Sequence, residues 1–235
     1  MNNFFEKRLA CALGLTLMLC LSSVLASAQN KRLRDAERHS TDAADVFNQI
    51  MGIREKGIPR DLLDKAEAIA VVPGVVKAAF IVGGQGGQGV ISRRIKGGWS
   101  APAFFNLGGA SFGAQIGAEK TDYVLLIMND AGLNGLLKDK FEIGGEVSVA
   151  AGPVGRTAAA STNVRLDAGI LSYSRSRGLF AGIALKGGTI TPDNDLNEAI
   201  YGAKASDVLQ PGKAASDAPA EVRIFPTTLS RYSRK

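Results

Sequence analysis

Ser111 is the side chain whose neighbours best fit the pattern of a nucleophile. It lies at the centre of Gly109-Ala-Ser111-Phe-Gly113, the Gly-x-Ser-x-Gly pattern of the hydrolase nucleophile elbow. A serine nucleophile needs a base to accept its proton, and His39 is the only histidine in the chain. His39 precedes the serine, in a charged segment, whereas hydrolases of this type place the histidine after it. The pattern is therefore more typical of a strand whose small residues let neighbouring backbones approach closely, and we predict no catalytic residue.

The glycine pattern Gly84-x-Gly86-x-x-Gly89 has the spacing of a dinucleotide-binding turn. That chemistry needs a helix N-terminus for the pyrophosphate and a carboxylate about twenty residues later for the ribose. Here the glycines lead into the strand-like Val90-Ile91, and the sequence near that distance carries no carboxylate. We therefore interpret Gly83–Gly89 as a turn between two strands and predict no cofactor.

A metal centre is not predicted either. Asp193-x-Asp195-x-Asn197 begins like a calcium loop, but Glu198 occupies the position that requires glycine. Because the stretch follows Pro192, it is more typical of a helix N-terminus stabilised by acidic residues. Both cysteines lie within the first 20 residues, and a single histidine does not build a transition-metal site.

Basic side chains beside aromatic residues are the remaining candidates for a site. Positive charge next to interfacial aromatics suits an anionic membrane surface, where each Lys or Arg contributes on the order of 1 kcal/mol. The alternative is ordinary solubilising charge at turns. The candidate lipid-binding residues are Arg93, Arg94 and Lys96 before Trp99, Arg175 and Arg177 around a turn, and Lys31, Arg32 and Arg34 in a charged N-terminal arm.

Residues 1–28 have the features of an export signal. Lys7 and Arg8 precede an apolar run from Leu9 to Leu25, and Ala26-Ser27-Ala28 offers a small-residue cleavage site. We therefore expect an exported protein, periplasmic or at the cell surface, cleaved after its residue 28.

Two alternatives remain open for this segment. The apolar run approaches spanning length and would also serve as an uncleaved anchor. The second alternative is a lipoprotein signal at Cys20, although the bulky Leu19 stands where such a signal needs a small residue. Cleavage would leave 26 basic and 21 acidic residues. That modest excess favours anionic partners, and export makes nucleic acid an unsuitable one.

The spacing of apolar residues predicts two helices before the first strand. The first runs from Thr41, as its cap, to Arg54, and Gly57 ends it. Residues 31–38 form either an earlier helical segment or a frayed arm. Pro59 occupies the favoured first position of a second, shorter helix.

Short apolar runs bounded by glycine and proline predict strands from residue 70 onward, with Pro73-Gly74 dividing the first two. A short helix over 130–140, three strands over 142–150, 165–174 and 179–186, and a last helix from Pro192 to Gly202 follow. The predicted fold is α+β, with a compact antiparallel β-rich core, barrel-like or sandwich, and flanking helices. The predicted organisation is a signal peptide over 1–28, an arm and amphipathic helix over 29–57, one domain over 58–209 and a basic, proline-interrupted tail over 210–235.

Five blocks of sequence, in order, resemble the SYLF domain family of lipid-binding proteins, which includes yeast actin-patch proteins. The blocks are AIAVVPGVVKAAFIVGG, GGWSAPAFFNLGG, LLIMN, KFEIGGEVSVAAGPVG and YSRSRGLFAGIALKGG, followed by Asn197 and Tyr201. The resemblance runs from about Ile58 to Leu209. It implies a compact β-rich core with flanking helices. It also implies binding of phosphoinositides and, in some members, of actin; bacterial members are commonly exported.

The sequence thus predicts an exported, non-enzymatic lipid-binding domain that engages anionic or phosphoinositide-like head groups. The alternative is a protein-interaction module that binds actin or a partner in the cell envelope. An esterase centred on Ser111 is the third and least supported hypothesis.

Overall fold

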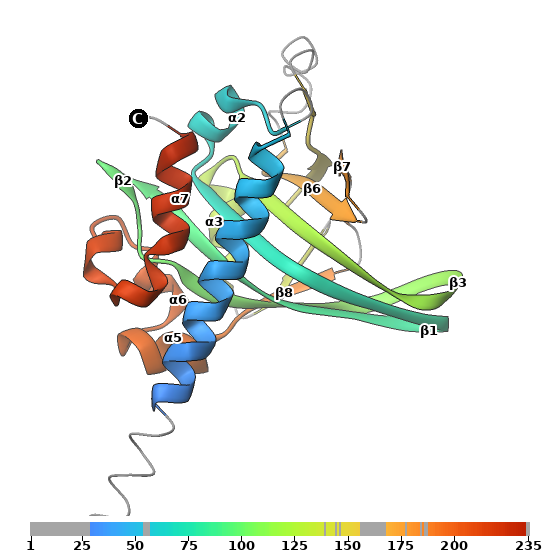
Figure 1. The fold of residues 1–235 in the computed structure, drawn as a ribbon, viewed down its shortest axis with the longest axis horizontal. Coiled ribbons are helices and arrows are strands. Elements are labelled where there is room, and N and C mark those ends of the chain that lie inside the picture. The colour runs from blue at the N-terminus through green and yellow to red at the C-terminus, as the bar shows by residue number, and fades with distance from the viewer. Residues whose placement is uncertain are drawn as a thin grey trace, which may run out of the picture.

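The computed structural model describes residues 29–53, 57–138, 140–143, 145, 147–155, 168–176, 178–183, 185 and 188–233, with the backbone alone for 78–83 and 110–118. A strongly curled, half-barrel sheet of eight strands lies at its centre, and helices cover parts of it (Figure 1). The predicted α+β class, with a β-rich core and flanking helices, is confirmed.

Two long strands, β1 (Ala68–Ile95) and β3 (Ala103–Ile127), form the middle of the sheet. They pair antiparallel along nearly their whole length, from Ala68 opposite Ile127 to Ile91 opposite Ala103. The two-residue strand β2 (Gly98–Trp99) pairs with the end of β1 and turns the chain back toward β3. In Figure 1 the two long strands run together to the right of the view, beyond the helices.

Pro73 and Gly74 do not divide this strand in two, contrary to the prediction from sequence. The register instead shifts between Val72 and Val75 as a β-bulge, in which Gly74 takes a φ of 56°. The Gly74 N–H donates to the Asp122 carboxylate at 2.8 Å. Because the bulge takes up a residue that has no N–H for the ladder, the strand continues past the proline.

The predicted turn at Gly83–Gly89 is also wrong, because all seven residues lie within β1 and pair with β3. Two of these glycines serve the packing of β1 against itself. A Cβ on Gly87 would lie 2.8 Å from Val75 Cγ2, and one on Gly89 would lie 2.5 Å from the Val71 carbonyl oxygen. The strand therefore folds back, and its two halves meet where only glycine leaves enough room.

This fold-back gives the sheet two facing layers. In one layer, β6 (Ile170–Ser176) pairs with the C-terminal end of β3. Two more strands, β7 (Leu179–Gly182) and β5 (Val149–Ala151), pair with β6, and β5 runs parallel to it. In the other layer, β8 (Gly188–Pro192) pairs with the N-terminal end of β3, and β4 (Phe141–Glu142) pairs with β8. The strand predicted over 142–150 is therefore two short strands in different layers.

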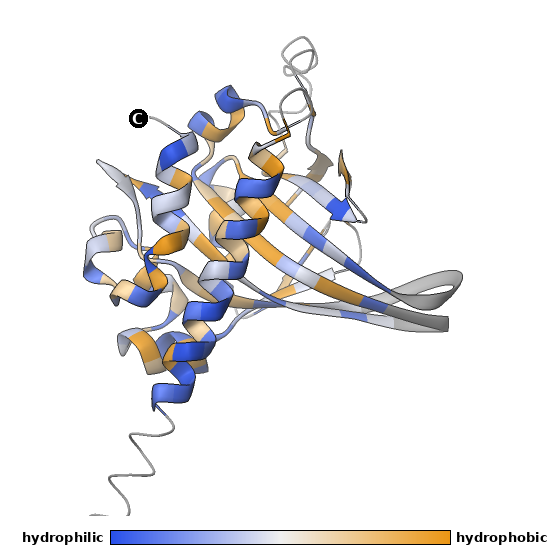
Figure 2. Ribbon diagram, viewed as in Figure 1, coloured by the Kyte–Doolittle hydropathy of each residue, from blue (hydrophilic) through white to orange (hydrophobic). Residues whose placement is uncertain are grey.

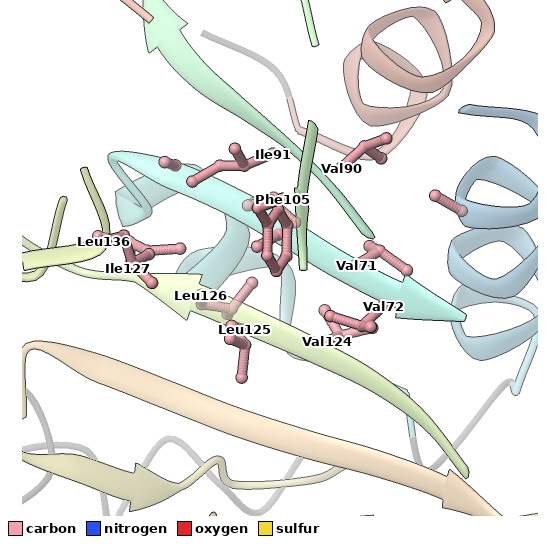
Figure 3. Close-up of a cluster of buried hydrophobic side chains, with 14 of the residues drawn as sticks. Val71, Val72, Val90, Ile91, Phe105, Val124, Leu125, Leu126, Ile127 and Leu136 are labelled. Atoms are coloured by element: carbon pink, nitrogen blue, oxygen red, sulfur yellow. The ribbon is translucent and has the colours of Figure 1, made fainter. Parts of the chain in front are cut away.

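The hydrophobic core lies between the layers and beneath the helices. Figure 3 shows Phe105 at the centre of a cluster that includes Val71 from the first half of β1, Val90 from the second half and Leu126 from β3. Figure 2 shows hydrophobic residues along the parts of the long strands that the helices cover. Residues far apart in the sequence thus share one core.

One continuous helix over residues 29–51 crosses the sheet. Residues 31–38 therefore form the earlier helical segment rather than a frayed arm, and Thr41 lies inside the helix instead of capping it. Its early turns are held by an ion pair between Asp35 and Arg38 at 3.2 Å and by the buried Ala36. Residues 1–28 lie outside the described part of the chain, so the export signal and its cleavage stay predictions.

Three predicted short helices are present. α2 (Arg60–Lys65) follows Pro59, and α3 (Asp130–Leu136) is capped by the side chain of Asn129. In α5 (Asn194–Tyr201), the Asp193 carboxylate accepts the N–H of Leu196 at 3.1 Å, and Gly202 ends the helix with a φ of 64°. This confirms a capped helix, rather than a calcium loop, at Asp193.

The chain after Tyr201 forms more regular structure than the sequence predicted. It contains α6 (Ala205–Val208), short 3-10 turns at Ala215–Asp217 and Ala220–Val222, and α7 (Ile224–Tyr232). The Trp99 indole donates to Ser233 Oγ at 3.2 Å, and the Tyr232 ring meets the Phe47 ring edge-on at 5.8 Å. The C-terminal segment therefore packs on both the β1–β2 end of the sheet and the helix over 29–51.

The contact inside β1 gives a matched pair of stability predictions. We expect Gly89→Ala to lower the free energy of unfolding by about 2 kcal/mol, because the added methyl overlaps the Val71 carbonyl and the Phe105 ring. Gly86→Ala should not lower it and should raise it by up to about 1 kcal/mol, because nothing lies closer than 4.0 Å to the new Cβ and alanine is favoured over glycine within a strand. Urea denaturation followed by the fluorescence of Trp99, the single tryptophan, measures both. Equal stabilities for the two variants would contradict the fold-back.

Candidate binding surfaces

Arg94, one of the predicted lipid-binding residues, is held inside the fold. Its Nε donates to the Ala66 carbonyl at 2.9 Å and its Nη2 to the Leu63 carbonyl at 2.5 Å, both at the C-terminal end of α2. The guanidinium also lies over the Trp99 ring, 4.3 Å from its centroid. Burial lowers the pKa of Arg94 from its ordinary value, while Asp64 acts in the opposite direction. The side chain caps the C-terminal end of α2, so its guanidinium is engaged within the protein and is less available to a partner.

Arg175 is also held by contacts within the protein. Its Nη2 and Nε donate to Asp122 Oδ2 at 2.7 and 3.0 Å, and its Nη1 donates to Gln49 of the helix over 29–51. Asp122 in turn accepts the Gly74 N–H of the bulge. One guanidinium therefore joins the first helix, β3, β6 and the β1 bulge.

The other predicted basic residues are more open to solvent. Arg93 is half-buried and pairs with the exposed Asp130 at 3.1 Å, and Lys96 is exposed in the turn between β1 and β2. Arg177 lies outside the described residues. Lys31, Arg32 and Arg34 are exposed on the first turns of the helix over 29–51.

These residues do not form one patch. Arg175 contacts Gln49 near the C-terminal end of the first helix, while the exposed Lys31, Arg32 and Arg34 lie at its other end. At 1.5 Å per residue the two ends are roughly 25 Å apart. The structure brings Arg93, Arg94 and Lys96 together only as neighbours along the end of β1.

The two residues considered for catalysis lie on different elements of the fold. Ser111 lies on β3, where only the backbone is described, and His39 is buried on the helix over 29–51. Burial and the neighbouring Arg38 lower the pKa of His39, which favours the neutral imidazole. In the described ranges, no three His, Cys, Asp or Glu side chains are placed to hold a metal ion. None of the described helices has both the length and the apolar character needed to cross a membrane.

An exposed apolar strip on β7 was missed by sequence reasoning. Leu179 is 79% exposed, and Ala181 on the same side of the strand is also exposed. The strand itself is firmly packed, because the Phe180 ring stacks on the buried Tyr173 ring at 5.6 Å. The signal in the sequence was a leucine directly after the turn glycine Gly178, a position where solvent exposure is the rule.

A cavity of about 420 Å³ lies where the C-terminal segment meets α5 and α6. Two exposed charged residues, Asp207 and Lys213, contribute to its lining, together with Tyr201 and small apolar residues. The Tyr201 hydroxyl is already engaged, since it donates to the Pro102 carbonyl at 2.6 Å. No local pattern in the sequence indicated this cavity, because residues from separate parts of the chain, from Ala101 to Pro219, form its walls.

Comparison with known proteins identifies the family. The profile of Ysc84, described as "Las17-binding protein actin regulator", matches residues 108–232. The chain belongs to the Ysc84 family. The match extends through α7, about twenty residues beyond the resemblance read from the sequence, and so includes the C-terminal segment packed against Trp99.

Several relatives of known name share this region. "LAS seventeen-binding protein 3" of Saccharomyces cerevisiae is 38% identical over 159 residues, which is 66% of this chain and 34% of the relative. "SH3 domain-containing YSC84-like protein 1" of Xenopus laevis is 36% identical over 150 residues, 63% of this chain and 44% of the relative. An SH3 domain-containing protein of Schizosaccharomyces pombe is 34% identical over 206 residues, 86% of this chain and 47% of the relative. The chain thus spans between about a third and a half of these relatives.

The Arg175 network gives a second stability prediction. Arg175→Ala should lower the free energy of unfolding by roughly 2 kcal/mol, because it leaves the half-buried Asp122 carboxylate with one partner fewer and frees the end of the first helix. Arg34→Ala removes the same charge from an exposed position and should change stability by less than about 0.5 kcal/mol. Urea denaturation compares the free energies of unfolding of the two variants. An equal loss in both would show that the contacts of Arg175 do not stabilise the fold.

Proposed function

We propose that this member of the Ysc84 family is a non-enzymatic binding module whose partner is a protein. The family description and the names of the relatives, which refer to Las17 binding and actin regulation, support this class of function. The observation that carries it here is the β7 strand, which packs through Phe180 on Tyr173 and presents Leu179 to solvent. An ester-hydrolysing activity that disappears in Ser111→Ala would contradict the non-enzymatic part of the proposal.

The β7 strip has the properties of a small docking surface. Within the described residues β7 pairs only with β6, so its other edge has no neighbouring strand there. A Cβ on Gly182 would overlap the Gly152 carbonyl oxygen, so this end of the strand lies directly against the residue that follows β5. A partner that covers Leu179 would gain its burial without having to order a loop.

Filamentous actin is the first partner to test, because the family is described as an actin regulator. The full chain should co-sediment with filaments, and Leu179→Ser should weaken binding about tenfold through the lost apolar contact. Ile224→Ser, at a residue 40% exposed on α7, is the matched control and should bind like the unmodified chain. If the unmodified chain stays in the supernatant, or if both variants bind equally, the β7 proposal for actin is wrong.

Binding to anionic lipid is the second candidate, and one observation favours it. Lys31, Arg32 and Arg34 place three exposed positive charges within one turn of a helix, directly after the predicted export signal. Together they would supply about 3 kcal/mol at an anionic surface. Arg94 and Arg175 support this candidate less, because their guanidinium groups make hydrogen bonds to other residues of the protein.

Vesicle co-sedimentation tests the lipid candidate with a charge-matched control. Replacing Lys31, Arg32 and Arg34 by glutamine should reduce pelleting with anionic vesicles at least tenfold. The same replacement at Arg60, Lys65 and Arg231, three exposed basic residues on α2 and α7, should have little effect. Equal pelleting with neutral and anionic vesicles, or equal loss in the two triple variants, would overturn the lipid proposal.

A further inference from the structure

The outer edge of β1 is open where the strand returns along the second layer. On one side this stretch, Gly84–Gln88, pairs with β3. On the other side, the only strand in the described parts of the chain that pairs with β1 is β2, at Arg94 and Ile95. Gly84, Gly86 and Gln88 are exposed. Backbone groups along this edge are therefore available to another strand.

Nothing in the sequence of this edge protects it. Soluble proteins usually blunt open edges with lysine, proline, a bulge or a covering segment. From Ile81 to Ile91, where its register with β3 is regular, the strand contains no charged residue and no proline. This stretch is therefore uncharged, and its residues shown to be exposed are two glycines and a glutamine.

Packing within the chain does not account for the exposed glycines. Gly87 and Gly89 face the first half of β1 and leave no room for a methyl group. Gly84 and Gly86 face the other way, and a Cβ on either would meet nothing closer than a carbonyl oxygen at 4.0 Å. Glycine weakens a strand by about 0.5–1 kcal/mol relative to alanine, and within strands it often marks the close approach of another backbone.

We propose that this edge pairs with the same edge of a second copy of the chain, forming a two-fold symmetric dimer. An antiparallel pairing centred on Gly86 places Gly84 of each copy opposite Gln88 of the other, and the same five residues serve both copies. None of the five residues carries a charge, so no like charges face each other in this pairing. A bilayer is a poor alternative, because hydrocarbon leaves open backbone groups unsatisfied.

Light scattering on the full chain, with the variants made in pairs, tests the pairing and its register. The unmodified chain should be a dimer at about 100 μM. The double variant Gly84→Lys, Gln88→Lys puts lysine opposite lysine twice and should weaken the dimer about tenfold. Gly84→Lys, Gln88→Glu puts lysine opposite glutamate and should restore it. A monomeric unmodified chain, or equal association of the two double variants, would overturn the proposal.

Cross-linking provides a readout that holds even if the charged variants misfold. With Cys11→Ser and Cys20→Ser as background, Gly86→Cys places one thiol on the proposed axis, where paired Cα atoms are close enough for a disulfide. Mild oxidation should give a covalent dimer. Ser216→Cys, exposed in the C-terminal segment, is the control and should remain monomeric. Failure of Gly86→Cys to cross-link above this control would also overturn the proposal.

Discussion

The close contact between the two halves of β1 is the constraint on which the rest of the structure depends. Gly89 lies against the Val71 carbonyl and Gly87 against Val75, at distances that exclude any side chain. This contact turns a single pair of long strands into two facing layers, and each layer then adds its own short strands. Because a methyl added at Gly89 must displace the Val71 backbone rather than a flexible side chain, the structure has little means of adjusting to it.

Charged side chains fix the helices to this sheet. Arg94 donates hydrogen bonds to the carbonyls at the C-terminal end of α2, and Arg175 joins the first helix to β3 and to the bulge at Gly74. A guanidinium is suited to this because its donors reach several acceptors in one plane. Basic residues that lie beside aromatics in the sequence can therefore stabilise the fold instead of binding a partner. The surface for a partner has to be sought among exposed residues that make no such contacts, such as Leu179.

Local signals in the sequence predicted the local structure well. Asp193 and Gly202 marked both ends of α5, and a capping side chain and a left-handed glycine are what the structure shows there. The prediction failed where contacts distant in sequence decide the outcome. A run of seven glycines and glutamines is typical of a turn, and its pairing with β3 and its packing against Val71 and Val75 make it a strand. The role of the C-terminal segment depends on a hydrogen bond across 134 residues, from Trp99 to Ser233, which no local pattern reveals.

The distance between the two halves of β1 tests the account most directly. Nuclear Overhauser effects on a sample with labelled valine methyl groups should connect a Val72 methyl with the Gly89 backbone, because a Cβ on Gly89 would lie 3.0 Å from Val72 Cγ2. The pairing of Gly89 with Phe105 across the ladder supplies an internal control. Contacts from Gly89 to both Phe105 and Val72 are the predicted result. Contacts to Phe105 alone would show a ladder that does not fold back, and would contradict the two-layer structure.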